Sequence, residues 1–345
     1  MSNIETVSLA STSPNSTFHT GLSLAASLYC NIGASKPKST LRSAGSATCA
    51  ITIFLKGDLG AGKTTFVQGL AKGLGINDAV VSPTFALENR YGETLLHMDL
   101  FRVDPKEARK LLEASEDFPG VRAVEWSERM SEVPSPHIIV SLTDPSPTTR
   151  TIEITFGYIA WPDRHTIEQW RRDVNLPEHI QLHCDAVGAF AKKCGEELLR
   201  RGTITRPEAL LKTGELHDLL RFIDFVNIED RSKQPEWIAL AEKYHLSHEE
   251  ACAEFMEEKK FSALSEIIRP HGLRTMEEEA PFRTIEQKIL FYADKRVMGD
   301  RVVSLRERFD DLIVRYGKGM ETEQAKGWRI KTEELERELF GTDVP

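Results

Sequence analysis

The stretch Gly57-Asp58-Leu59-Gly60-Ala61-Gly62-Lys63-Thr64 has the residue types and spacing of a phosphate-binding loop, G-x-x-x-x-G-K-[ST]. Its glycines allow backbone N–H groups to turn inward around an anion. Lys63 is then placed to reach the β and γ phosphates of a nucleotide, and the Thr64 hydroxyl to bind Mg²⁺. We therefore predict an ATP and Mg²⁺ site made of this loop and Thr65. The alternative, an accidental glycine-rich turn, is disfavoured because every fixed position matches.

A strand and a helix must flank this loop for its chemistry to work. Residues 51–55 predict a buried strand, and residues 65–74 carry apolar side chains at helical spacing. The predicted helix points the positive end of its dipole at the bound phosphates. The loop therefore has the strand–loop–helix setting that phosphate binding requires.

Two acids, Asp99 and Glu125, end further predicted strands. Ligands of parallel sheets bind at the carboxyl ends of the strands, so Asp99 is placed to hold Mg²⁺. Glu125 is placed to polarise the attacking water or to hold Mg²⁺ through water. The turn Ser82-Pro83-Thr84 is predicted to sense the nucleotide through the Thr84 hydroxyl. Taken singly, each feature has a plainer interpretation, because strand-end acids are often only solvated or cap a helix, and such turns are often only turns.

Four motifs in this order resemble the TsaE family, small bacterial ATPases needed to make N6-threonylcarbamoyladenosine in tRNA. The motifs are the phosphate loop, Ser-Pro-Thr-Phe at 82–85, His-x-Asp-Leu-Phe-Arg at 97–102 and Glu-Trp at 125–126. The resemblance covers about residues 17–157.

That resemblance implies that Lys63 and Thr64 bind the phosphates and Mg²⁺, and that Asp99 and Glu125 complete the metal and hydrolysis site. Ser82 and Thr84 would belong to a switch-like loop. The implied partners are TsaD and TsaB proteins, whose complex the family resets by binding and hydrolysing ATP, so contact with tRNA is expected to be indirect. The stretch 31–47 departs from the family pattern and leaves the packing of the N-terminal helix open.

The second half of the chain carries histidines and acids in the order of a metal site. His217 and Asp218 are adjacent on a predicted helix, and an imidazole nitrogen and a carboxylate oxygen can bind one metal ion. His183 precedes this pair and Asp294 follows it. The order H…HD…D resembles the HD-domain metal-dependent phosphohydrolases over about residues 166–310.

His248 and His271 extend this resemblance to the HD proteins that hold two metal ions, in which Asp218 would bridge the ions and take part in catalysis. The implied metal is Fe, Mn or Co. The implied substrate is a nucleotide or another phosphoester, for example a dinucleoside polyphosphate or a nucleoside monophosphate. Histidines on helices more often pack in a core or cap a helix, and two choices stay open: His179 competes with His183, and His245 competes with His248.

Three basic residues are weaker candidates for holding the substrate phosphate in this half. They are Arg221, Lys295 and Arg296.

The chain has 345 residues, which is enough for about two domains. We predict a flexible tail at 1–16, a TsaE-like domain at 17–159, an HD domain at 160–320 and a charged helix or tail at 321–345. Alternating strands and helices predict that the first domain is an α/β P-loop NTPase domain with a largely parallel sheet. The long helical patterns after residue 160 predict an all-α HD domain.

The composition excludes several other classes of protein. No apolar run approaches the roughly 20 residues of a membrane helix, and the N-terminus lacks the basic start of a secretory signal. Five scattered cysteines without a C-x-x-C pair disfavour a zinc ribbon or a disulfide framework, and they favour a cytoplasmic location. The net charge of −9 disfavours broad non-specific binding to nucleic acid.

The sequence therefore predicts an ATPase for tRNA modification fused to a phosphohydrolase. In one alternative, the HD half is a non-catalytic nucleotide sensor that regulates the ATPase. In another, the phosphate loop belongs to a nucleotide kinase. The Ser-Pro-Thr signature and the lack of an arginine-rich lid segment in the first half disfavour the kinase.

Overall fold

The computed structural model describes residues 4–28, 51–130, 133, 137–146, 149–157, 160–224, 234–244, 246–316 and 321–345. The chain forms two compact units, one made of Ile4–Ile159 with Gly202–Ile204 and the other of Ala160–Arg201 with Thr205–Pro345. The predicted loop at 31–47 and the competing histidine His245 lie outside the described residues.

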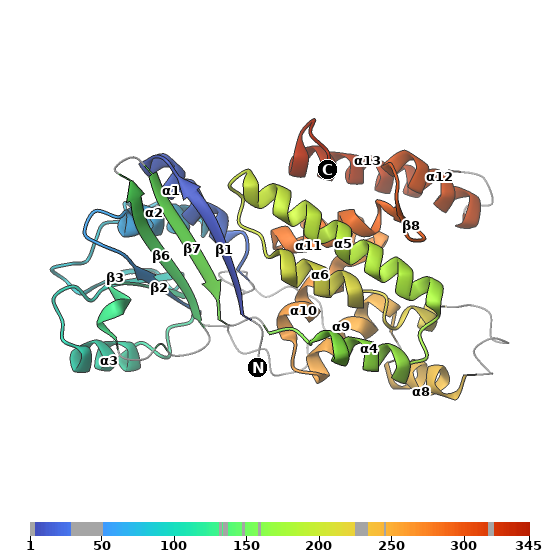
Figure 1. Ribbon diagram of the computed structural model, residues 1–345, viewed down its shortest axis with the longest axis horizontal. Coiled ribbons are helices and arrows are strands. Elements are labelled where there is room, and N and C mark those ends of the chain that lie inside the picture. Colours follow the sequence, from blue (N-terminus) through green and yellow to red (C-terminus); the bar gives the residue numbers. More distant parts are fainter. Residues whose placement is uncertain are drawn as a thin grey trace. The chain divides into compact units, whose positions relative to one another are not determined.

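The first unit is built on a seven-stranded sheet with the order β1-β7-β6-β2-β5-β4-β3 (Figure 1). Strands β6, β2, β5 and β4 run parallel in the centre, and β7, β1 and β3 extend the sheet in the antiparallel sense. The predicted α/β class is confirmed, and the sheet is mixed with a parallel centre. The strands are β1 (Glu5–Ser11), β2 (Thr52–Lys56), β3 (Glu88–Tyr91), β4 (Leu95–Asp99), β5 (Val121–Glu125), β6 (His137–Ser146) and β7 (Thr149–Phe156).

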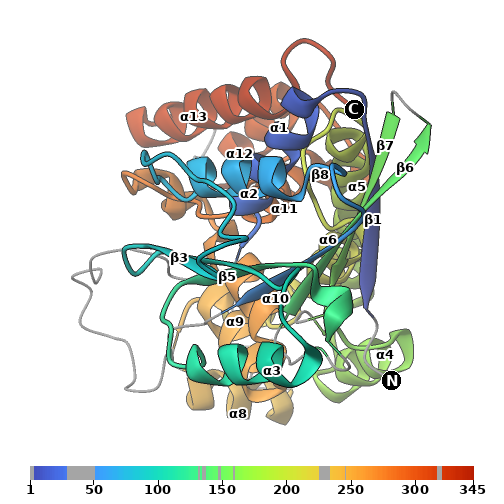
Figure 2. The same ribbon diagram turned by 90° about the vertical axis from the view of Figure 1, so that its left-hand side faces the viewer.

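Helices cover both faces of this sheet (Figure 2). Alternate side chains of a strand point to opposite faces, so Met98 and Val124 pack in one core cluster with Leu112 of the helix after β4. Asp99 and Glu125, the next residues of the same strands, therefore project to the opposite face, which carries the helix that follows the phosphate loop. The helices are α1 (Pro14–Ala25) and α2 (Lys63–Gly73) on one face and α3 (Pro105–Ala114) on the other.

The predicted flexible tail at 1–16 is wrong for most of its length. Residues 5–11 form β1, which pairs with β7 from Glu5 opposite Phe156 to Ser11 opposite Arg150. Alternate residues of β1, including Val7 and Leu9, are buried, so the strand has the period of two that a half-buried edge requires. Its serines and threonines are typical of a flexible tail, but Val7 and Leu9 already alternate with polar or small residues in the sequence.

The described residues of the second unit are helical apart from one short hairpin and the connecting turns. Helix α5 packs against both α6 and α11, and α13 packs against α11 and α12 in the same compact unit. None of the helices in the described part of the chain is long and apolar enough to cross a membrane. The helices are α4 (Arg164–Asp173), α5 (Glu178–Arg200), α6 (Pro207–Leu216), α8 (Pro235–Tyr244), α9 (His248–Glu258), α10 (Ser262–Ile268), α11 (Ile285–Asp294), α12 (Leu305–Tyr316) and α13 (Glu323–Phe340); the short 3-10 turns are η2 (Arg221–Asp224), η3 (Arg269–His271) and η4 (Leu273–Glu277), and the hairpin is β8 (Val297–Met298) with β9 (Arg301–Val302).

Helices α1 and α2 cross so closely that glycine is needed on each of them. A Cβ atom built on Gly69 would lie 1.8 Å from the carbonyl oxygen of Phe18, and one built on Gly21 would lie 2.0 Å from that of Phe66. Each helix backbone therefore occupies the space that a side chain of the other would fill. This contact holds α2, and with it the end of the phosphate loop, against α1.

The substitution Gly69→Ala is expected to lower the free energy of unfolding of the first unit by about 1–3 kcal/mol, because the added methyl group must displace the backbone of α1. Gly327→Ala is the matched control: a Cβ atom at this position of α13 meets nothing within 4 Å. The control is expected to raise stability by up to about 1 kcal/mol through helix propensity. Urea unfolding followed by circular dichroism measures both, and equal effects would contradict the close crossing.

Candidate functional site

The phosphate loop adopts a backbone that only glycine accommodates readily at three positions. Gly57, Gly60 and Gly62 have φ angles of +139°, +85° and +101°. Helix α2 begins directly after the loop, at Lys63, and its N-cap residue Gly62 has no side chain to cap the first-turn N–H groups. These donors and the helix dipole make this end of α2 suited to an anion.

Lys63 is folded back onto its own loop. Its Nζ donates to the carbonyl oxygens of Gly57 at 2.6 Å and Asp58 at 2.9 Å, and it lies 3.6 Å from the ring centroid of Trp126. Burial lowers the pKa of Lys63, although nearby carboxylates, chiefly Glu125, oppose the shift. To reach a phosphate, the ammonium group must leave the indole ring and the two carbonyls.

The two predicted acids lie side by side at the carboxyl ends of β4 and β5. Asp99 pairs with Glu125 in the parallel register, and Glu125 pairs with Leu55 of the strand that precedes the phosphate loop. The Thr64 hydroxyl donates to Glu125 Oε1 at 2.8 Å. His97 Nε2 lies 2.8 Å from the same oxygen. The structure therefore joins the predicted Mg²⁺ ligand Thr64 to Glu125 rather than to Asp99.

Asp99 is bound instead by the predicted switch loop. The hydroxyls of Ser82 and Thr84 donate to Asp99 Oδ2 at 3.1 Å and 2.5 Å, and the Phe101 N–H donates to Oδ1 at 2.9 Å. Val80 and Val81, which precede this turn, lie outside any helix or strand. The loop at 82–84 and the acid at the end of β4 thus form one hydrogen-bonded group.

Sequence reasoning missed two side chains that contact this site. Trp126 lies against Lys63 and adopts a left-handed backbone with a φ angle of +63°. Arg150 of β7 donates to the carbonyl oxygen of Gly60 at 3.4 Å. The Glu-Trp motif was a usable signal for Trp126, whereas Arg150 lies in a strand that no motif connects to the loop.

All six predicted metal ligands of the second unit lie in one group, although they come from five segments of the chain. They are His183 on α5, His217 and Asp218 just after α6, His248 at the first residue of α9, His271 in η3 and Asp294 at the last residue of α11.

Three of the histidines are oriented by backbone carbonyl groups. A carbonyl oxygen can only accept, so Nδ1 must carry the hydrogen in each case, and Nε2 keeps the lone pair that binds a metal. The pairs are His183 with Gly299 at 3.0 Å, His217 with Gly214 at 2.8 Å and His271 with Ile268 at 2.7 Å.

The fourth histidine, His248, is oriented by carboxylates. Its Nδ1 bonds to Asp224 and lies 3.2 Å from Glu249 Oε2. Such carboxylate–histidine pairs commonly orient metal ligands. Sequence reasoning missed Asp224 and Glu249, because neither belongs to the motif of the ligand set.

The Nε2 atoms and the two aspartates converge in two sets that share Asp218. In one set, Asp294 Oδ1 lies 3.1 Å from His183 Nε2 and 3.7 Å from His217 Nε2. Asp218 Oδ2 also lies 3.7 Å from His217 Nε2.

In the other set, Asp218 Oδ1 lies 3.1 Å from His248 Nε2 and 3.6 Å from His271 Nε2. His217 Nε2 is buried without a hydrogen-bond partner among the described residues. An orphaned lone pair facing two carboxylates fits a metal ion.

The electrostatics of this group also favour a cation. Burial opposes ionisation of Asp218, but the imidazoles of His217 and His248 outweigh it and hold the pKa of Asp218 well below its usual range. Burial likewise opposes a charge on His248, but chiefly the Asp218 carboxylate raises the pKa of His248 to about 9. Carboxylates held ionised in this way attract positive charge, which a bound metal ion would supply.

The structure also places His179, the alternative to His183, and the three basic residues predicted to hold the substrate phosphate. The structure brings His183, rather than the exposed His179, to the group. Lys295 bonds to Asp294 and to the carbonyl oxygen of His271, so it holds the ligand set. Arg296 bonds to Val303, Tyr292 and Glu336, whereas Arg221 contacts His248 and Asp224 at the edge of the group.

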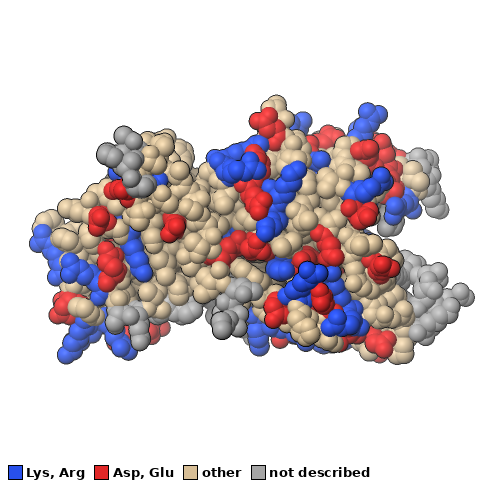
Figure 3. All heavy atoms as spheres, in the orientation of Figure 1, with Lys and Arg blue, Asp and Glu red and all other residues tan. Residues whose placement is uncertain are grey.

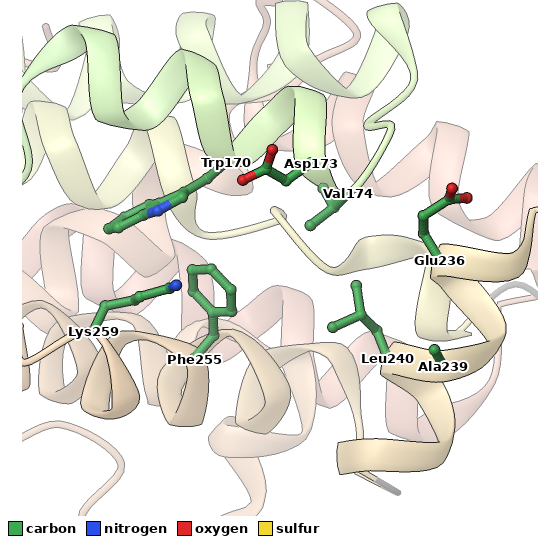
Figure 4. A pocket seen from close by; sticks show the side chains of 8 residues that line it. All are labelled: Trp170, Asp173, Val174, Glu236, Ala239, Leu240, Phe255 and Lys259. Atoms are coloured by element: carbon green, nitrogen blue, oxygen red, sulfur yellow. The ribbon is translucent and has the colours of Figure 1, made fainter.

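A separate cavity of about 300 Å³ lies between α4, α8 and α9 (Figure 4). Its walls are mainly apolar, with the rings of Trp170 and Phe255 packed edge to face at 5.3 Å. Lys259, Asp173 and Glu236 also line it. None of the predicted site residues lies among its lining residues.

A phosphate loop between a strand and a helix, with acids at the ends of neighbouring parallel strands, defines the first unit as a P-loop nucleotide-binding domain. The profile of the family "Threonylcarbamoyl adenosine biosynthesis protein TsaE" matches residues 27–152. The TsaE protein of Nostoc sp. PCC 7120 is 50% identical over 116 residues, which cover 31% of this chain and 72% of that protein. The chain therefore belongs to the TsaE family, and the resemblance on which we based the prediction is confirmed.

Two further TsaE relatives match a smaller part of their own length. The Synechocystis sp. PCC 6803 TsaE protein is 50% identical over 91 residues, covering 24% of this chain and 58% of that protein. The Bacillus subtilis TsaE protein is 43% identical over 81 residues, covering 23% and 51%. The crystal structure of Bacillus subtilis YdiB aligns with 50% of this chain and 98% of its own, at 26% identity and a TM-score of 0.32.

Binding of ATP with Mg²⁺ is expected to raise the fluorescence of Trp126, because the Lys63 ammonium that lies against its ring must move to the phosphates. Titrating the full chain with Mg-ATP while recording tryptophan emission measures this. The variant Trp126→Phe keeps an aromatic face for the lysine and is expected to lose the change, although the other four of the five tryptophans remain. Unchanged emission at saturating Mg-ATP would contradict the proposed movement.

Proposed function

We propose that the first unit binds and hydrolyses ATP in the service of tRNA N6-threonylcarbamoyladenosine modification. The observation that carries this proposal is the meeting of Lys63, Thr64, Asp99 and Glu125 at one edge of the sheet. The names of the TsaE relatives supply the process.

In this proposal the loop N–H groups and Lys63 bind the phosphates, and Thr64 and Asp99 hold Mg²⁺. The ion would neutralise the charge of the phosphates. Glu125 orients the attacking water. Ser82 and Thr84 bond to Asp99, so a change at this acid on nucleotide binding would be passed to their loop.

The proposed partners are TsaD- and TsaB-like proteins, with tRNA contacted indirectly through them in the cytoplasm. On the face of the helical unit shown in Figure 3, basic and acidic side chains are interspersed rather than segregated. The net charge of −9 supports a partner-mediated role over direct wrapping of tRNA.

The variant Lys63→Ala tests this function. It is expected to lower ATP hydrolysis about a hundredfold or more, because the charge that stabilises the transferred phosphoryl group is lost. Steady-state phosphate release, with and without TsaD- and TsaB-like proteins, and tRNA modification in cells lacking their own TsaE are the measurements. Lys72→Ala, an exposed position later in α2, is the matched control. Wild-type hydrolysis and tRNA modification by Lys63→Ala would exclude the function.

We also propose that the second unit is an HD-type phosphohydrolase that acts on a nucleotide or another phosphoester. The convergence of four imidazole Nε2 atoms on two carboxylates favours this function. One metal would be held by His183, His217, Asp218 and Asp294, and the other by Asp218, His248 and His271. Fe, Mn or Co ions bound there would supply Lewis-acid chemistry at the phosphoester.

Metal content and turnover of the full chain test this second function. The Lys63→Ala chain is used so that the first unit adds no phosphate release. After loading with Mn²⁺, Fe²⁺ or Co²⁺ it is expected to hold two ions and to release phosphate from members of a nucleotide panel. His271→Ala is expected to keep about one ion. The double variant His217→Ala/Asp218→Ala is expected to keep none, because Asp218 belongs to both ligand sets and His217 to the first.

His165→Ala, an exposed histidine of the same unit, is the control and is expected to bind metal as the parent chain does. Fewer than one ion per chain would contradict the metal site. Two bound ions without turnover of any nucleotide would favour the alternative in which this unit senses a nucleotide and regulates the ATPase.

A further inference from the structure

One oxygen of Glu125 accepts both hydrogen bonds that reach its carboxylate from described residues. The Thr64 hydroxyl and His97 Nε2 each lie 2.8 Å from Oε1. Oε2 is left for a further donor. A carboxylate that orients an attacking water needs such an available oxygen, and it also needs a fixed direction.

His97 is placed to provide that direction. It lies on β4 two residues before Asp99, on the same face of the sheet, and opposite Ala123 of β5. The small side chain of Ala123, two residues before Glu125, leaves room for the imidazole beside the carboxylate. His97 is fully buried at 0% exposure and Glu125 is 3% exposed, so no bulk water competes for their hydrogen bond.

The second ring nitrogen shows which way this hydrogen bond runs. His97 Nδ1 is buried with no hydrogen-bond partner among the described residues. An unpaired buried N–H group is costly, so the ring hydrogen belongs on Nε2, where it is donated to Glu125. The neighbouring buried residues of this strand, Leu96 and Met98, are apolar. Burying an imidazole with one unpaired nitrogen costs free energy, so packing alone does not explain a histidine at this position.

We propose that His97 is a positioning residue for ATP hydrolysis, which fixes Glu125 through Oε1 so that Oε2 faces the attacking water. Thr64 is the other donor to Oε1, but its hydroxyl oxygen is also the proposed Mg²⁺ ligand. Of the two donors to Glu125, His97 is therefore the one whose proposed role is only to orient the carboxylate. This inference rests on the proposed ATPase function of the first unit.

Paired substitutions in the full chain test this role. His97→Leu removes the donor and keeps a buried side chain of similar size, whereas Gln in His97→Gln can place an amide N–H close to the position of Nε2. We expect His97→Leu to lower kcat for ATP hydrolysis about ten- to a hundredfold, as loss of an orienting partner typically does, with the KM for ATP changed less than about threefold. His97→Gln is expected to recover most of this loss.

A double-mutant cycle with Glu125→Gln separates positioning from general damage to the fold. If His97 acts through Glu125, adding His97→Leu to Glu125→Gln lowers kcat no further. A wild-type kcat in His97→Leu, equal losses in the Leu and Gln variants, or independent losses in the double mutant would each overturn the role. Failure of the ATPase function itself is seen separately, as hydrolysis by Lys63→Ala at the wild-type rate, and it overturns this role as well.

Discussion

The parallel pairing of β2, β5 and β4 is the constraint on which the nucleotide site depends. Backbone hydrogen bonds set Leu55 beside Glu125 and Glu125 beside Asp99, so the phosphate loop and both acids end at one edge. A slip of one residue would turn each acid to the opposite face of the sheet, into the core against α3. The apolar strand residues that set this register are thus as necessary to the site as the acids themselves.

The group of predicted metal ligands in the second unit is built on helix ends. His217 and His271 each donate to a carbonyl three residues earlier, Gly214 and Ile268, at the end of a helical segment where carbonyls lack partners within the helix. Orienting the imidazoles therefore satisfies the backbone at the same time. Asp218 belongs to both ligand sets. Both sets therefore depend on the position of the short segment that follows α6.

The predictable parts of both sites were those with local signals. The phosphate loop matched a fixed spacing, and the motifs of the first half pointed to Asp99 and Glu125, which the structure pairs at the ends of β4 and β5. The strand at 5–11 was missed because its polar residues suggested a flexible tail, although alternate residues are buried. Trp126 as a contact of Lys63, and Asp224 as a partner of His248, were missed because each depends on a neighbour far away in the sequence.

The sequence by itself determined the family of the first half and the predicted ligand set of the second half, because the phosphate loop and the order of histidines and aspartates follow from residue type and spacing. Only the tertiary structure decided which oxygen of Glu125 is engaged, that Asp99 holds the loop at 82–84, and that the imidazoles turn Nε2 inward. Each of these features depends on how a side chain is oriented within a few ångströms of its partner. They are made by strand register and by hydrogen-bond partners up to 116 residues away along the chain, as between His183 and Gly299, and no local pattern encodes them.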